Sequence, residues 1–325
     1  MPDATMTHLQ HKAVRTSPPS IAGRLRWLAP CLIVIVAIAS THALAGWPQM
    51  WATAFGIYFA CKWWVVMIAA RNGARFSVFN LAAFVFAWAG MDPRPFAIGA
   101  TKTNAAMWVE PISWREGLVK LLAGVALLLA SPLIAARFGQ YAAMWVCVSA
   151  YCLILHFGLL HLIGHAWQRA NRPVEAIMQQ PARSNSLADF WSRRWNRAFR
   201  DVSNALVIRP TRRLLGPAGA VGLVFVASGL VHELLMSWPA RGGWGLPTAY
   251  FTLQAVGLFI ERSRLGRRIL LTARGEDREE AGVMRHAWRS RLWTAFVVIA
   301  PLPLLVHPPF VNNVVVPFFR LIGAL

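Results

Sequence analysis

Residues 217–238 read PAGAVGLVFVASGLVHELLMSW, an apolar run that carries two adjacent ionisable residues, His232 and Glu233. A helix needs about 20 mostly apolar residues to cross the hydrocarbon core of a bilayer, and this run is long enough. An ionisable side chain inside a membrane helix is costly and marks a functional candidate by default. The run therefore predicts a membrane span with a functional site near its end.

Similar apolar runs recur along the chain, at 27–46, 48–70, 117–136, 141–165, 245–261 and 292–308, with weaker segments at 76–90 and 310–325. We therefore predict an all-α, polytopic transmembrane helical bundle with about seven to nine membrane segments. Residues 23–325 are expected to form a single membrane-embedded domain, with its motifs between 186 and 260. The polar first residues, 1–22, are expected to form a disordered tail.

Composition supports a membrane protein. The chain is 57% hydrophobic and 14% charged, whereas a soluble domain carries about 25% charged residues. The formal net charge of +20 comes from 33 Lys and Arg against 13 Asp and Glu. These basic residues lie between the apolar runs, where they indicate cytoplasmic loops and not a nucleic-acid surface. The four cysteines lie inside apolar runs and indicate neither a metal site nor a disulfide framework.

Charge also predicts orientation. Ten Arg lie between 166 and 216, and nine lie between 262 and 291. Both segments and the basic N-terminus are expected on the cytoplasmic side, most simply of the cytoplasmic membrane. An even number of crossings must then precede residue 166, so 76–90 is expected not to cross. The first run could be a cleaved signal peptide, but its length favours an uncleaved helix.

The stretch from Ser186 to Asn196 reads SLADFWSRRWN. Ser186 with an acid three residues later resembles a capping box, which predicts that a helix starts there. Continued at helical spacing to residue 200, the helix would place its apolar side chains on one face and Asn196 on the other. We predict an amphipathic helix at the membrane surface, with Trp191 and Trp195 at headgroup level.

Small residues surround the predicted approach to His232. Ser228 and Gly229 lie one turn before it on the same helix face. A second histidine group lies in the run 141–165, at His156, His161 and His165. One helix cannot direct all three at a single metal ion, since the first lies about 180° from the third. No metal is expected.

Several of these stretches together resemble the membrane-bound O-acyltransferase (MBOAT) superfamily, most closely its wax-synthase-like branch. The resemblance rests on the Asp189–Asn196 stretch and on His232, which follows Asn196 in a membrane helix. Softer support comes from Trp88–Pro93, His156–Gly158 and Gly245–Phe251. The resemblance implies that His232 is the central catalytic residue, that Asn196 is its partner, and that acyl-CoA is the donor.

The expected activity is transfer of a fatty acyl group from acyl-CoA, as co-substrate, to a long-chain alcohol, with no cofactor. Neutral imidazole can accept the alcohol proton, and an amide can position the thioester or donate to the oxyanion. Arg side chains suit the phosphates of CoA. Expected substrate-binding residues are Arg193, Arg197, Arg200, Trp191, Trp195, Ser228 and Glu233. Glu233 could tune His232 or hydrogen-bond within the bundle.

Two other functions remain open at this point. The acceptor could be a sterol, diacylglycerol, glycan or secondary-metabolite hydroxyl. The chain could also be a non-catalytic lipid transporter or scaffold, although transporters more often show inverted repeats or paired broken helices.

Overall fold

The computed structural model describes residues 21–41, 43–101, 109–270 and 287–325. Every regular element in these ranges is a helix, which confirms the predicted all-α class. The predicted tail, up to residue 20, lies outside the described residues, and so does most of the basic segment 262–291. Helix α1 (Ile21–Thr41) begins at the first described residue.

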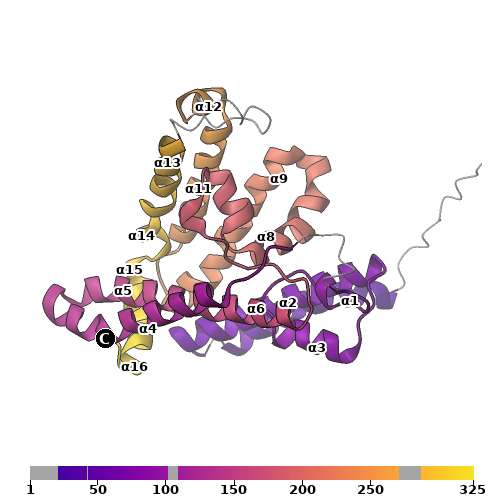
Figure 1. Ribbon diagram of the computed structural model, residues 1–325, viewed down its shortest axis with the longest axis horizontal. Coiled ribbons are helices and arrows are strands. Elements are labelled where there is room, and N and C mark those ends of the chain that lie inside the picture. The colour runs from indigo at the N-terminus through magenta and orange to yellow at the C-terminus, as the bar shows by residue number, and fades with distance from the viewer. Residues whose placement is uncertain (1–20, 42, 102–108, 271–286) are drawn as a thin grey trace, which may run out of the picture.

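The helices form two groups whose axes cross steeply (Figure 1). The first group contains α1, α2 (Trp47–Arg71) and α4 (Trp114–Phe138). It also contains the continuous helical run Gln140–Arg169, which comprises α5, η2 and α6. The second group contains α9 (Arg209–His232), α11 (Leu246–Arg262) and α13 (Ala287–Ile299). The C-terminal helices α14 (Leu302–Leu305), α15 (Pro308–Phe310) and α16 (Val316–Leu321) lie where the two groups meet.

Four described helices are long and apolar enough to cross a membrane: Trp47–Arg71, Trp114–Phe138, Gln140–Arg169 and Arg197–Ala240. A fifth is possible if the segments Trp288–Leu305 and Pro308–Leu321, bent by 61°, act as one span. The multi-pass character is thus confirmed, while four to five spans are fewer than the predicted seven to nine. Of the other helices, α11 has 17 residues, and the part of α1 whose side chains are described covers only Leu28–Thr41, so neither is counted among these spans.

The weak segment 76–90 contains the nine-residue helix α3 (Val78–Phe86), whose N-terminus is capped by the Ser77 hydroxyl. At 1.5 Å per residue this helix is about 13 Å long, less than half of a hydrocarbon core. The chain then continues irregularly into the short helix η1 (Arg94–Phe96). This agrees with the prediction that the segment does not cross.

Lys62 of α2 holds the irregular chain after α3 in place. Its side chain is 1% exposed, and its ammonium donates to the carbonyl oxygens of Phe84, Trp88 and Gly90 at 2.8, 2.7 and 2.6 Å. It also lies 3.5 Å from the centre of the Phe84 ring. One lysine therefore satisfies three carbonyl groups that an apolar bundle would otherwise leave without donors.

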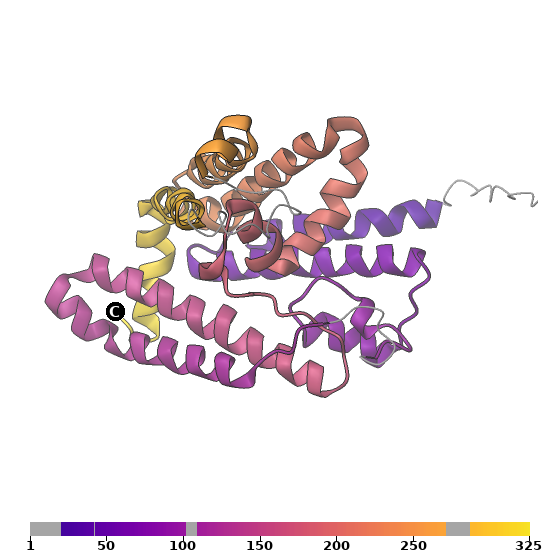
Figure 2. The ribbon, with the colours of Figure 1, turned by 45° about the horizontal axis from the view of Figure 1, so that its top comes forward.

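The helical stretch Arg197–Ala240 is a hairpin and not one straight span. Its break is Gly216, whose φ of 69° and ψ of 172° are non-helical, followed by Pro217. Only glycine adopts this conformation at little cost. The first leg contains α8 (Arg197–Ser203) and η5 (Asn204–Ile208), and Figure 2 shows the second leg returning beside it. The break coincides with the predicted start of the span at 217.

We expect Lys62→Met to destabilise the fold, because three buried carbonyl groups lose their donors. Each such group costs about 1–3 kcal/mol, so the melting temperature in detergent should fall by several degrees. Lys120→Met is the matched control, because Lys120 is partly exposed and pairs with Glu116 on its own helix, a contact worth about 0.5 kcal/mol. Equal melting temperatures for the two variants would contradict the role assigned to Lys62.

Candidate active site

The predicted helix start at Ser186 is correct, but the helix is much shorter than expected. The Ser186 hydroxyl accepts from the Asp189 amide at 3.0 Å and caps α7 (Leu187–Asp189). The π-helical turn η4 (Phe190–Arg194) follows, and Trp195 is then extended. The prediction of one amphipathic helix to residue 200 is therefore wrong, and the apolar face it implied does not form.

Asn196 lies at this break and starts the next helix. Its backbone is left-handed, with φ 42° and ψ 65°, a conformation that asparagine tolerates better than most residues. Its side-chain oxygen caps α8 by accepting from the backbone amide of Phe199 at 3.1 Å. The backbone amide of Asn196 donates to the Met178 sulfur at 3.2 Å. Because the cap occupies the oxygen, the side-chain NH2 is the group left to donate to a ligand.

His232 ends α9 with a fixed ring orientation. Its Nδ1 lies 2.7 Å from the carbonyl oxygen of Ser228, one turn earlier. A carbonyl oxygen can only accept, so in the neutral ring Nδ1 carries the proton and Nε2 carries the lone pair. The Phe251 ring of α11 packs against the imidazole with centroids 4.5 Å apart. The orientation of the imidazole thus leaves the lone pair of Nε2 as its proton acceptor.

Glu233 hydrogen-bonds within the bundle, which is one of the two roles that the sequence left open. Its Oε1 accepts from the backbone amides of Gly245 and Thr248, both at 3.1 Å, and from the Thr248 hydroxyl at 2.8 Å. These groups form the N-terminus of α11. The other oxygen, Oε2, is buried without a hydrogen-bond partner in the described part of the chain.

A series of aromatic contacts connects the two candidate catalytic residues. Trp195, next to Asn196, stacks on Phe190 at 5.5 Å, and Phe190 contacts Trp191 at 5.0 Å. Trp191 then contacts Phe251 at 6.1 Å, and Phe251 contacts His232. Within the described residues no hydrogen bond joins Asn196 to His232 directly. The structure therefore connects the two residues through packed rings.

An apolar slot of about 250 Å³ lies between the hairpin, α11 and the Trp191 segment. Ser228 and Phe251, the two residues that hold the His232 ring, line the end that we call its floor. Arg200 and Arg262 also line the slot, and Arg262 lies eleven residues after Phe251 on α11. Its volume is just below the ~300–1,000 Å³ of typical ligand pockets, so it suits one narrow chain. His232 and Asn196 are not among the lining residues.

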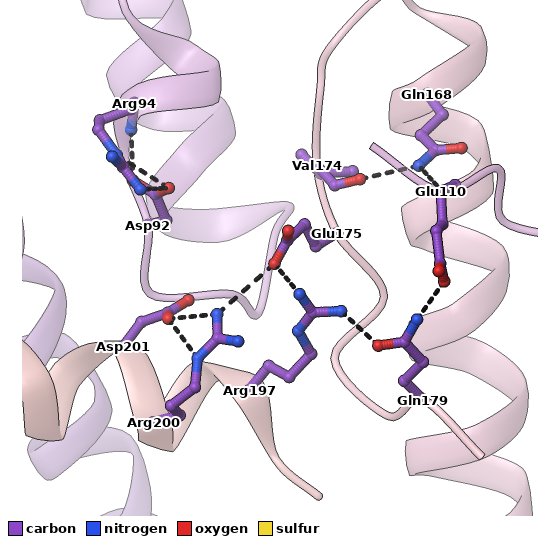
Figure 3. A network of polar contacts seen from close by, with 10 residues as sticks. All are labelled: Asp92, Arg94, Glu110, Gln168, Val174, Glu175, Gln179, Arg197, Arg200 and Asp201. Atoms are coloured by element: carbon purple, nitrogen blue, oxygen red, sulfur yellow. Dashed lines mark hydrogen bonds and ion pairs between the residues drawn. The ribbon is translucent and has the colours of Figure 1, made fainter. Parts of the chain in front are cut away.

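The three arginines singled out from the sequence lie in different surroundings. Arg197 and Arg200 belong to a polar network on α8 (Figure 3). Arg197 pairs with Glu175 and donates to Gln179 at 2.7 Å. Arg200 pairs with Asp201 at 2.6 Å and reaches Glu175 at 3.5 Å. Arg193 is exposed on η4.

A polar cleft of about 810 Å³ adjoins this network, and Arg200 lines both the cleft and the apolar slot. Arg94 and Arg209 add two cationic side chains to the cleft wall, beside Asp92 and Asp201. The hydrogen bond from Arg94 to Asp92 raises the pKa of that guanidinium, which stays charged. Sequence reasoning missed both residues: only the fold brings Arg94 to α8, whereas Arg209 follows α8 in the same helical stretch.

The three histidines of the run 141–165 do not converge. His165 Nδ1 lies 2.6 Å from the carbonyl oxygen of Ile112. Nδ1 of His156 and Nε2 of His161 are buried without partners in the described residues. No group of three or more His, Cys, Asp or Glu in the described part of the chain could hold a metal ion.

Parts of this chain match known proteins. Residues 174–253, which include both Asn196 and His232, match the model of the Membrane bound O-acyl transferase family. The long-chain-alcohol O-fatty-acyltransferase of Simmondsia chinensis is 35% identical over 92 residues, 25% of this chain and 26% of that protein. The probable long-chain-alcohol O-fatty-acyltransferase 1 of Arabidopsis thaliana is 40% identical over 76 residues, 21% of this chain and 22% of that protein.

These matches confirm the resemblance: the segment 174–253 matches the membrane-bound O-acyltransferase family, and the chain is distantly similar to plant wax synthases. The aligned part spans about a quarter of the length of these curated relatives. The stretch Trp88–Pro93, which also supported the resemblance, lies outside the family match.

The capping role of the Asn196 side chain can be tested by substitution. Aspartate is also a good N-cap and tolerates left-handed backbone, so Asn196→Asp should keep the melting temperature of the wild type. Asn196→Ala loses the cap and should be less stable by about 1 kcal/mol. Thermal unfolding in detergent measures both, and an alanine variant as stable as the aspartate variant would argue against the cap.

Proposed function

We propose that this protein is an acyl-CoA-dependent O-acyltransferase that transfers a fatty acyl group to the hydroxyl of a long-chain alcohol. The observation that carries the proposal is the fixed His232 ring beside the floor of an apolar slot, within the segment that matches the family. A base next to a narrow apolar site is what acylation of a lipophilic alcohol requires.

The reaction follows from the hydrogen bonds of the two side chains. Nε2 of His232 removes the alcohol proton as the alcohol oxygen attacks the thioester carbon, which forms the new C–O bond. The thioester oxygen becomes an oxyanion, and the free NH2 of Asn196 is the donor we assign to it. Collapse breaks the C–S bond, and the imidazolium returns its proton to the CoA thiolate. The Ser228 carbonyl holds Nδ1–H throughout and favours the transient imidazolium.

The donor site is proposed from the two adjoining cavities. Acyl-CoA has an anionic head and a long flexible chain, and the cavities offer a cationic cleft next to an apolar slot. Arg262 and Phe251 lie eleven residues apart on α11, so the slot extends about 16 Å from its charged end to its floor. We assign the CoA phosphates to Arg200, Arg94 and Arg209, and the pantetheine arm, which ends in the thioester, to the slot walls, including Trp191.

Arg197 and Arg193, which the sequence also suggested for binding acyl-CoA, belong to this proposal. Arg197 adds positive charge beside the cleft, and Arg193 extends the basic surface of the same segment. Both lie in the basic segment 166–216, which we propose to face the cytoplasm, where CoA is found. We also propose that residues 23–325 form a single membrane-embedded domain. Its about seven to nine membrane segments would comprise the long spans and the shorter helices that pack against them.

The alcohol is proposed from the relatives alone. The aligned proteins from Simmondsia and Arabidopsis are described as acting on long-chain alcohols. Another hydroxyl acceptor is compatible with the same base and donor site. The acceptor is therefore the part of the proposal that a substrate panel decides.

The test is acyl transfer by purified protein in lipid nanodiscs, with labelled acyl-CoA and a panel of alcohols, sterols and diacylglycerol. We expect ester formation with long-chain alcohols and a roughly 10²–10⁴-fold lower turnover for His232→Ala. His165→Ala is the matched control, since that ring also binds a backbone carbonyl but lies on α6. His232→Ala with wild-type turnover would contradict the mechanism, and wild type without transfer to any acceptor would favour a non-catalytic lipid protein.

A further inference from the structure

Helix α11 carries no residue assigned to the chemistry, yet it is bonded at both ends to the elements that carry His232 and Asn196. Its N-terminal end is held by Glu233, the residue after His232. The carboxylate is 8% exposed, and one oxygen accepts all three donors from Gly245 and Thr248. A helix N-terminus has unpaired amides and a positive dipole end, and a carboxylate satisfies both.

The C-terminal end of α11 is held by a second buried carboxylate that is used in a different way. Glu261 is 3% exposed. Its Oε2 accepts from the Leu187 amide at 2.6 Å, and its Oε1 accepts from the Ala188 amide at 3.2 Å. These two amides form the start of α7, the helical turn that leads through η4 to Asn196. Helix α11 is thus hydrogen-bonded to the segment that carries Asn196, nine residues before Asn196.

The middle of α11 contacts the same two elements. Phe251 packs against His232 at 4.5 Å and against Trp191 at 6.1 Å. Gly229 of α9 allows this close packing, because a Cβ at that position would lie only 2.8 Å from the Thr248 Cα. Polar anchors at the two ends and an aromatic contact between them leave α11 little freedom to move relative to either element.

We propose that α11 is a rigid strut that sets the separation of His232 and Asn196, with Glu233 and Glu261 as its positioning residues. The proposal rests on the proposed function, because that function requires both side chains to act on one thioester. A helix of 17 residues is about 25 Å long and stiff, so displacing either end shifts one catalytic group relative to the other.

The two carboxylates should respond differently to the same substitution. Glu233 uses one oxygen, and its other oxygen has no partner. In Glu233→Gln the amide oxygen can take the three donors, and the NH2 occupies the unpartnered position. Glu261 uses both oxygens as acceptors. Glu261→Gln must direct its NH2 at a backbone N–H, which repels it and releases one end of the strut.

The experiment compares kcat for acyl transfer among Glu233→Gln, Glu233→Ala and Glu261→Gln, with each value normalised to folded protein. We expect Glu233→Gln to keep a kcat roughly tenfold or more above that of Glu233→Ala. Glu233→Ala and Glu261→Gln should lose roughly 10–100-fold in kcat, the scale of a 1 Å misplacement of catalytic groups. Equal loss in both Glu233 variants, or full activity in Glu261→Gln, would overturn the proposal.

Hydrogen exchange of the same variants reports on the strut without using activity. Glu233→Ala should speed exchange in peptides containing Gly245 and Thr248, and Glu261→Gln should speed exchange in peptides containing Leu187 and Ala188. Unchanged exchange at these amides would refute the anchors. If wild type transfers no acyl group, the proposed function fails while the exchange pattern still decides the anchors, so the two failures are distinguishable.

Discussion

A helix end inside an apolar bundle leaves backbone groups that water cannot reach, and every break in a helix therefore needs a side chain to close it. This constraint shapes the described structure throughout. Lys62 closes the end of α3 through three carbonyl groups. Glu233 closes the start of α11, and Glu261 closes the start of α7. His307, fully buried, accepts from the Phe310 amide at 3.1 Å at the start of α15.

The candidate active site is built from the same breaks. Asn196 is available because the helix stops at Arg194 and restarts at Arg197. His232 lies at the junction between α9 and the π-helical turn η6 (Glu233–Ser237). Such π-helical turns often occur at functional sites, because they change which side chains face the interior. The same breaks thus expose the side-chain NH2 of Asn196 to a ligand and fix the ring of His232.

The sequence predicted much of this architecture and one of its helix caps. Apolar run lengths are sufficient to indicate helices, and Ser186 and Pro217 mark a start and a break that local chemistry dictates. Periodicity could not reveal that residue 196 is left-handed, because a single residue outside helical backbone leaves the apolar pattern almost unchanged. The roles of Lys62 and Glu261 depend on contacts 22 and 74 residues away along the chain, which no local pattern encodes.

The most direct test of the central claim, that the apolar slot delivers a thioester to His232, is photo-crosslinking. An acyl-CoA thioether with a diazirine near the sulfur would be irradiated with the protein in nanodiscs, and labelled residues would be located by mass spectrometry. The account predicts labelling at Phe251, Phe225 and Trp191, which unlabelled acyl-CoA prevents. Labelling confined to outward-facing residues of α4, such as Leu129 and Leu133, and insensitive to competition would contradict it.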